Sequence, residues 1–244
     1  HLVNKIMPNI TQIHISSTFF WKQVVRMKTQ IVKQAETAQN NVITDESKRI
    51  IYKSCLSALM IVAISILVNL SIRLDYVVLG SSLGEVSITE TLQVIMLAIA
   101  SWSFFQLSKQ EEQVKHAAIL ISGFFAVLII RELDYWMDMI RHGSWVFPAL
   151  TVTALACAKA YQGGKGTVNE MARILQVPHM KLLIGAVILL LVFSRLYGMG
   201  SFWQQVMNES YIRDVKNISE EGMELLCYCL IALSAVRMRR EITE

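Results

Sequence analysis

The chain has 244 residues, of which 54% are hydrophobic, with a formal net charge of +4 and a mean hydropathy of +0.44. This composition is too apolar for an ordinary soluble domain and predicts an integral membrane protein, with the lipid bilayer as its surroundings. The sequence has no basic patch with interleaved aromatic residues, so no nucleic-acid partner is expected.

Residues 1–53 precede the first long apolar segment and are predicted to form an N-terminal cytoplasmic arm. Two interpretations of its start stay open. In the first, Met27 is the initiator and residues 1–26 are a non-native extension, because the sequence begins at His1 and shows no signal peptide. In the second, apolar and basic residues at helical spacing form an amphipathic helix that lies on anionic lipid. The apolar positions are Phe20, Val24, Met27 and Ile31, and the basic positions are Lys22, Arg26, Lys28 and Lys33.

Six segments approach the length of a membrane-spanning helix. The hydrocarbon core is about 30 Å thick, so a spanning helix needs about 20 mainly apolar residues. The segments are residues 54–72, 90–107, 117–136, 144–161, 182–200 and 220–236. Their apolar runs lack the alternation of barrel strands, which favours helices. We therefore predict an all-α, polytopic membrane helical bundle, with a six-helix transmembrane domain at residues 54–240 and a cytoplasmic tail at 241–244.

Lysine and arginine are distributed unevenly between the two ends of these segments. Basic residues in short loops stay on the cytoplasmic side. The richer side carries Lys48, Arg49, Lys53, Lys109, Lys115, Lys159, Lys165, Arg173, Lys181, Arg237, Arg239 and Arg240, and the poorer side carries Arg73, Arg131, Arg141, Arg195, Arg213 and Lys216. Both termini are therefore predicted to be cytoplasmic, in a multi-pass protein of a bacterial inner membrane.

Two connections between the segments are specific enough to be tested. Residues 75–87 are predicted to be a short external loop with Gly and Ser as turn residues. Residues 162–181 are predicted to be a flexible basic loop on the cytoplasmic side, in which paired glycines and Pro178 leave room for a short surface helix.

The third apolar segment ends early in a charged stretch. Residues 117–130 span about 21 Å at 1.5 Å per residue, which is too short to cross the bilayer. The helix is therefore expected to continue through RELDYWMD at residues 131–138. At three- and four-residue steps its polar and aromatic residues fall on two faces. One face has Arg131, Asp134, Tyr135 and Asp138, and the other has Glu132 and Trp136.

Three other segments bring polar side chains to the same outer half of the bundle. A charged residue inside the bilayer costs about 2.5 kcal/mol or more, so such residues are usually paired and functional. Tyr228 is expected one turn deeper than Glu224. Together with the charged stretch, these segments define the predicted ligand-binding or ion-binding site, which comprises Glu90, Gln93, Arg131, Glu132, Asp134, Asp138, Arg195, Glu221 and Glu224.

Three interpretations of this charge cluster stay open. Acidic residues at a helix N-terminus favour the helix dipole, and charges near the end of a span reach water, which would account for Glu90 and Glu221. Alternatively, Arg131 and Arg195 neutralise neighbouring carboxylates and lock the bundle together as buried ion pairs. The third interpretation is a polar pocket or pathway open to the outside, favoured because charges of both signs occur on different helices at matching depth.

No cofactor and no metal site is predicted. No two of the histidines share a helix face, which argues against a haem or zinc site. The cysteines all fall within predicted spans and are interpreted as packing thiols. The histidines are His1, His14, His116, His142 and His179, and the cysteines are Cys55, Cys157, Cys227 and Cys229.

These features predict a transporter or channel-like protein for a cation, proton or small charged solute, rather than an enzyme. Carboxylates suit hard cations and proton relays, and a neighbouring arginine keeps a carboxylate ionised. One alternative is a membrane-embedded enzyme that acts on a lipid or lipid-linked substrate at the outer leaflet, with carboxylates as acid and base. Another is a non-catalytic subunit whose polar face docks a partner in an oligomer or a membrane complex.

Overall fold

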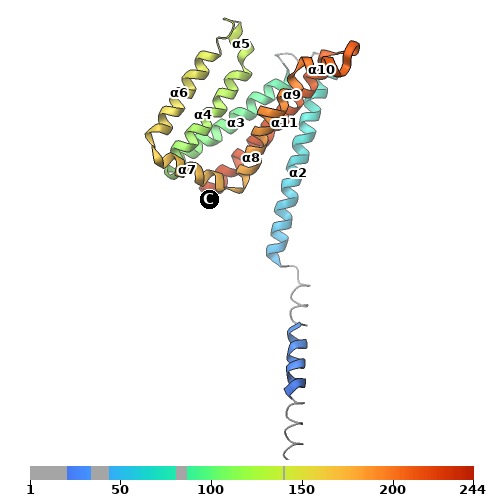
Figure 1. Cartoon of the computed structure of the whole chain (residues 1–244), viewed down its shortest axis with the longest axis vertical. Helices are drawn as coiled ribbons and strands as arrows, with labels where there is room; N and C mark the ends of the chain where they lie inside the picture. Colours follow the sequence, from blue (N-terminus) through green and yellow to red (C-terminus); the bar gives the residue numbers. More distant parts are fainter. Residues whose placement is uncertain (1–20, 34–43, 81–86, 140) are drawn as a thin grey trace, which may run out of the picture. The chain divides into compact units, whose positions relative to one another are not determined.

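The computed structural model describes residues 21–33, 44–80, 87–139 and 141–244 (Figure 1). Throughout these ranges the regular structure is helical and no strand occurs, which confirms the predicted all-α class. The chain divides into two compact units, residues 1–58 and 59–244.

In the first unit, residues 21–33 form a helix whose side chains are all exposed. Phe20, the first apolar position of the predicted amphipathic helix, lies outside the described residues. Helix α2 (Asp45–Arg73) begins directly after Thr44, whose hydroxyl accepts a hydrogen bond from the Ser47 N–H at 3.2 Å. A hydroxyl in this position satisfies one of the free N–H groups of the first helical turn. The helix therefore starts nine residues before the predicted span at 54.

The second unit contains the rest of α2 and the other helices. Its long helices are α3 (Ile88–Gln110), α4 (Lys115–Glu132), α6 (Val146–Gln162), α8 (Pro178–Ile188) and α11 (Arg213–Thr243). Its shorter helices are α5 (Asp134–Asp138), α7 (Lys165–Gln176), α9 (Ser194–Gly198), α10 (Gly200–Met207), η3 (Glu112–Val114) and η5 (Asn208–Ser210). Two wider π-helical turns, η2 (Leu74–Val78) and η4 (Leu189–Phe193), extend α2 and join α8 to α9.

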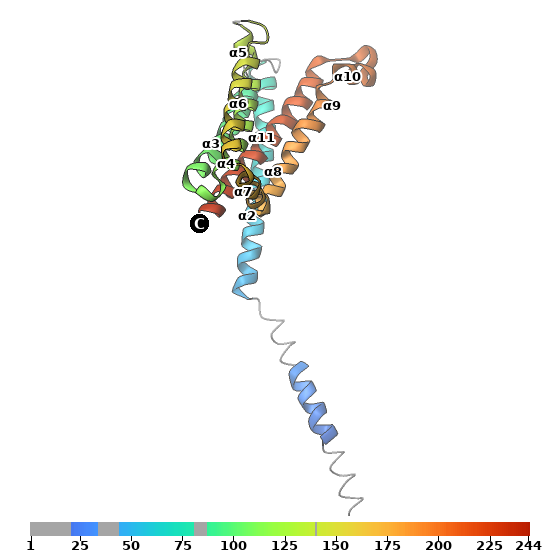
Figure 2. The same cartoon turned by 60° about the vertical axis from the view of Figure 1, so that its left-hand side comes forward.

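Helix α3 is the centre of this unit, because it packs against both α4 and α11. Helix α6 covers the other side of α4, and α8 and α9 run along α11 (Figures 1 and 2). The apolar core lies between these helices and includes Leu97 and Phe104 of α3, Phe125 of α4 and Ile231 of α11. The rings of Phe104 and Phe125 stack with their centroids 5.8 Å apart.

Small residues hold α4 close to its two neighbours. Ser101 of α3 and Ser122 of α4 exchange hydrogen bonds, each hydroxyl donating to the other residue's carbonyl oxygen, at 3.0 and 2.9 Å. On the opposite side, a Cβ atom added to Gly123 would lie 2.5 Å from the Cβ atom of Ala156 in α6. Such small-residue contacts and interhelical hydrogen bonds are typical of helix pairs in membranes.

Within the described ranges, four helical segments are long and apolar enough to cross a membrane, namely Asp45–Val78, Ile88–Gln110, Glu112–Glu132 and Pro178–Gly198. They match four of the six predicted spans. The other two segments are also helical, but α6 has only 17 residues, fewer than the roughly 20 that cross a hydrocarbon core. The α11 segment is long enough, but it carries Glu220, Glu221 and Glu224 in one stretch. The predicted count of six is therefore not confirmed.

Two connections differ from their predictions. Residues 75–78 were predicted to belong to the first external loop. They instead form, with Leu74, the π-helical turn η2 that continues α2. Residues 165–176, within the predicted flexible loop, form α7 between Gly164 and Pro178, so only the short surface helix expected there is confirmed.

Candidate functional site

The first half of α11 presents a row of polar side chains to the interior of the second unit. Glu221, Glu224 and Tyr228 follow one another at three- and four-residue steps, which places them on one face of the helix. Glu224 is only 9% exposed and Tyr228 is 1% exposed. The row therefore leads directly into the apolar core, of which Tyr228 and Ile231 are members.

Gln93 of α3 joins this row at Glu221. Its side chain has no exposed surface. The Nε2 atom of Gln93 donates one hydrogen bond to Oε2 of Glu221 at 2.7 Å and another to the carbonyl oxygen of Glu221 at 3.3 Å. The predicted proximity of these two residues, which are 128 positions apart in the chain, is thus present in the structure.

Glu132, the last residue of α4, reaches the same face of α11. The hydroxyl of Tyr228 donates a hydrogen bond to Oε1 of Glu132 at 2.7 Å. Helix α4 ends here because Leu133 leaves the helical conformation, with φ −95° and ψ 13°. Trp136, which was expected on the same face as Glu132, lies in the following α5 and is 53% exposed.

Ser194 brings the α8–α9 segment to Glu224. In the π-helical turn η4, the N–H of Ser194 bonds to the carbonyl oxygen of Leu189, five residues back. This leaves the carbonyl of Leu190 without its usual helical partner, and the Ser194 hydroxyl donates to it at 2.5 Å. The same hydroxyl oxygen lies 3.3 Å from Oε1 of Glu224. A π-turn inside a helix often marks a functional position.

The two predicted arginines do not contact these carboxylates. Arg195 is exposed and Arg131 is half-buried. Both act on Glu132 at electrostatic range. Within the described part of the chain, however, no ion pair involves either arginine. The structure therefore provides no direct contact for the interpretation of the cluster as buried Arg–Glu pairs.

The remaining predicted residues are Glu90 of α3 and Asp134 and Asp138 of α5. Glu90 is half-buried in the first turn of α3, one turn from Gln93, and its N–H donates to the hydroxyl of the N-cap residue Ser87 at 3.1 Å. Asp134 is exposed on α5. Asp138 accepts a hydrogen bond from the Gly143 N–H at 2.8 Å and pairs with the exposed His142. Asp138 thus shapes the turn after α5.

We call the residues that the structure brings together the carboxyl cluster. They are Gln93, Glu132, Ser194, Glu221, Glu224 and Tyr228. All the functional atoms of the cluster are oxygen or amide nitrogen, and three of its side chains are carboxyls. A carboxyl group can take up and release a proton or bind a hard cation, so the cluster has the groups that a proton or cation site needs.

A buried carboxylate that the sequence analysis missed is Asp75 in η2. It has no exposed surface. Its two oxygens accept hydrogen bonds from the N–H groups of Ile88 and Thr89, both at 2.9 Å, and from the Thr89 hydroxyl at 2.6 Å. Asp75 therefore caps the N-terminus of α3. Its neighbours Leu74, Val77 and Val78 continue the apolar pattern of α2, and this signal could have placed Asp75 within the membrane segment rather than in a loop.

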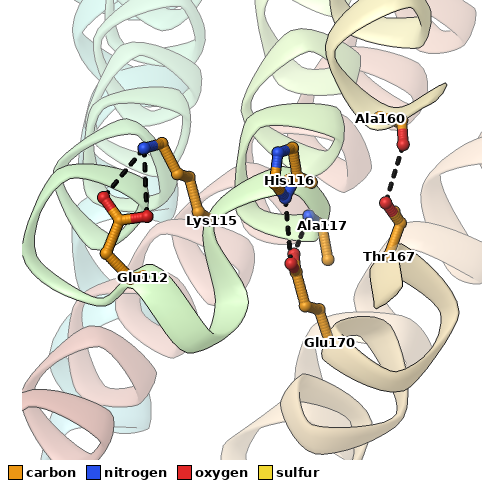
Figure 3. A network of polar contacts seen from close by, with 7 residues as sticks. All are labelled: Glu112, Lys115, His116, Ala117, Ala160, Thr167 and Glu170. Atoms are coloured by element: carbon orange, nitrogen blue, oxygen red, sulfur yellow. Dashed lines mark hydrogen bonds and ion pairs between the residues drawn. The ribbon is translucent and has the colours of Figure 1, made fainter. Parts of the chain in front are cut away.

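The N-terminus of α4 has a cap comparable to that of α3, and helix α7 supplies it (Figure 3). Glu170 lies beside the start of α4, where its Oε2 accepts the N–H of Ala117 at 2.9 Å and its Oε1 lies 2.9 Å from Nδ1 of His116. A Cβ atom on Gly163 would lie 2.7 Å from Cγ of the His116 ring. A glycine at this position therefore lets the link between α6 and α7 approach α4.

This cap predicts a pH-dependent stability. Burial tends to raise the pKa of Glu170, but hydrogen bonds from His116 and from the Ala117 N–H outweigh it and lower the pKa below its ordinary value of 4.5. A lowered folded-state pKa gives stability that is complete above the ordinary pKa and is lost as the pH falls through the folded pKa. We expect Glu170→Gln to reduce the loss of thermal stability between about pH 5 and about pH 3, compared with the unmodified chain.

The measurement is the unfolding midpoint of the purified protein in detergent, followed by circular dichroism at several pH values. Glu112→Gln is the matched control, because Glu112 is an exposed carboxylate that pairs only with Lys115 on the next turn. Identical pH profiles for Glu170→Gln and the unmodified chain would contradict this role of Glu170.

The described residues thus define a helical protein with four candidate membrane-spanning segments and a cluster of half-buried and buried carboxyl groups. In comparisons with known proteins, no protein-family model, no curated protein and no solved structure matches the chain.

Proposed function

We propose that this chain is a multi-pass membrane transporter or channel-like protein for a cation, a proton or a small charged solute, and that the carboxyl cluster is its binding site. The observation that carries this proposal is the position of Glu132, Glu221 and Glu224. These carboxyls come from two helices, with Glu224 buried and Glu132 and Glu221 half-buried, and the described ion pairs include none of the three.

Burial of carboxyls in a bilayer is costly, and the cost is usually accepted where the group serves an ion or proton pathway. A structural role alone is a poor explanation for Glu224. A purely structural carboxylate would be expected to have strong donors, as Asp75 has, whereas the hydroxyl of Ser194 near Glu224 is already directed to the carbonyl of Leu190. The proposal extends to the membrane arrangement: α6 and α11 complete six crossings, both termini are cytoplasmic, and the membrane is a bacterial inner membrane.

Flux measurements test this proposal. The purified chain is reconstituted into liposomes, and uptake or current is recorded under imposed gradients of protons, sodium, potassium and methylammonium. We expect saturable flux of at least one of these cations, above that of protein-free liposomes. Absence of flux for all of them, together with consumption of an added lipid substrate, would contradict transport and support a membrane-embedded enzyme.

A further inference from the structure

Among the described residues, one fully buried side-chain atom of the carboxyl cluster has no hydrogen-bond partner. The Oε1 atom of Gln93 is buried and accepts no hydrogen bond from the described residues, although the Nε2 atom of the same amide donates to Glu221. Buried polar atoms are nearly always paired, with protein or with ordered water, so a buried unpaired oxygen calls for an explanation.

Reversing the amide does not solve the problem. Both contacts of Nε2 are to acceptors, the carboxylate oxygen and the carbonyl oxygen of Glu221. Turning the amide over would bring Oε1 against these two oxygens and would leave Nε2 unpaired instead. The orientation of Gln93 is therefore set by Glu221, and Oε1 needs a donor from elsewhere.

The other members of the cluster do not supply that donor. The hydroxyl proton of Tyr228 is directed to Glu132, and that of Ser194 is directed to the carbonyl of Leu190. Ionised carboxylates are acceptors only. The missing donor is thus either a small molecule with an O–H or N–H group, or a carboxyl group of the cluster that carries a proton.

The Ser194 hydroxyl is shared between two acceptors. Its one hydrogen is directed mainly to the carbonyl oxygen of Leu190, at 2.5 Å, and more weakly to Oε1 of Glu224, at 3.3 Å. Glu224 therefore has no strong donor among these contacts, and a proton on its own carboxyl group would supply one.

We propose that the cluster holds a water molecule that donates to Gln93 Oε1, and that the transported species is the proton, carried between this water and the carboxyls of Glu221 and Glu224. In the uptake step, a hydronium ion gives its proton to the Glu221 carboxylate, which leaves a neutral carboxyl group and a neutral water. The proton then passes through the water to the Glu224 carboxylate, and Glu221 returns to its ionised form. Glu221 and Glu224 are three residues apart on one face of α11, which makes them neighbours. This inference rests on the proposed function.

The first test uses the unmodified chain in liposomes that contain a pH-sensitive dye. We expect a membrane potential to drive proton flux, with no comparable flux of sodium, potassium or methylammonium. Flux of one of the other cations without proton flux would overturn the proton assignment but leave the transport function in place. No flux of any of the four, together with consumption of an added lipid substrate, would overturn both, so the two failures are distinguishable.

The second test removes the orphan oxygen. Gln93→Leu keeps the approximate size of the side chain but takes away both its acceptor and its donor. We expect proton flux to fall roughly tenfold or more, the size that the loss of a hydrogen bond to a charged group produces. Gln110→Leu is the matched control, because Gln110 lies on the same helix but is exposed. Unchanged flux in a folded Gln93→Leu protein would overturn the inference.

A third measurement does not depend on any variant of Gln93. Infrared spectroscopy of the unmodified chain in lipid detects a protonated carboxyl group by its C=O stretch, which shifts when the protein is exchanged into D₂O. We expect such a band at neutral pH and its loss or reduction in Glu224→Gln. Absence of the band in the unmodified chain would overturn the assignment of a bound proton to the cluster.

Discussion

Replacing Glu224 with glutamine is expected to abolish transport while leaving the protein folded in the membrane. Glutamine has nearly the same shape as a protonated glutamic acid and presents an N–H donor in place of its O–H. The contact with Ser194, 3.3 Å away in the unmodified chain, can therefore be kept. What disappears is the ability to take up and release a proton. Loss of a group that transfers a proton typically costs about a hundredfold or more in rate, and we expect a decrease of that size in flux.

The measurement combines flux in liposomes with the amount of folded protein recovered from the membrane. Glu112→Gln is the matched control, because it neutralises an exposed carboxylate outside the cluster, and both flux and protein level should stay unchanged. Full flux in Glu224→Gln would contradict a role for Glu224 in transport.

A different result would support the buried ion-pair interpretation. Arg131 acts on Glu224 at electrostatic range without contacting it. If Glu224→Gln fails to accumulate, and a double variant with Arg131→Glu and Glu224→Arg restores both protein level and flux, the pair is structural. Under the proposed function the double variant remains inactive, because an arginine cannot exchange a proton at neutral pH.

Hydrophobic patterning predicted the positions of the long helices well, because the apolar runs differ sharply in composition from the connections. The span predicted at 90–107 corresponds to α3 at Ile88–Gln110, and the one at 182–200 corresponds to Pro178–Gly198. The helix ends were predicted less well, and this has a physical reason. Helix ends are set by local capping, such as that of α2 by Thr44, and the conformation of a single residue, Leu133, ended α4 before the charged stretch was complete.

The depth of the charged residues could be predicted, but their partners could not. The positions of Gln93, Glu132 and Glu224 along their predicted helices placed all three in one half of the bundle, and the structure brings them onto α11 or its immediate neighbours. Which side chains face one another depends on the rotation of each helix. The π-helical turns η2 and η4 each insert a wider turn and change that rotation, and nothing in the periodicity of the sequence indicates them.

Replacing Asp75 with alanine is expected to destabilise the protein more than any other single change in the polar network. The substitution leaves three donors without their acceptor, the N–H groups of Ile88 and Thr89 and the hydroxyl of Thr89. Each unpaired buried donor costs about 1–3 kcal/mol, so we expect a decrease in the free energy of unfolding of about 3 kcal/mol or more. Thr89→Val, which removes only the hydroxyl and keeps the two backbone bonds, should cost clearly less.

The measurement is denaturant unfolding in detergent, followed by the fluorescence of the native tryptophans, with Asp134→Asn as the control for loss of an exposed carboxylate. Equal stability of Asp75→Ala and the unmodified chain would show that the cap does not hold α3.

If the cap does hold α3, its loss also affects the carboxyl cluster, because Thr89 lies one turn before Gln93 on the same buried face. A shift of the start of α3 would move the Gln93 amide away from Glu221, so Asp75→Ala should lower proton flux even in the fraction of protein that remains folded. Normal flux per folded molecule would instead limit Asp75 to stability alone.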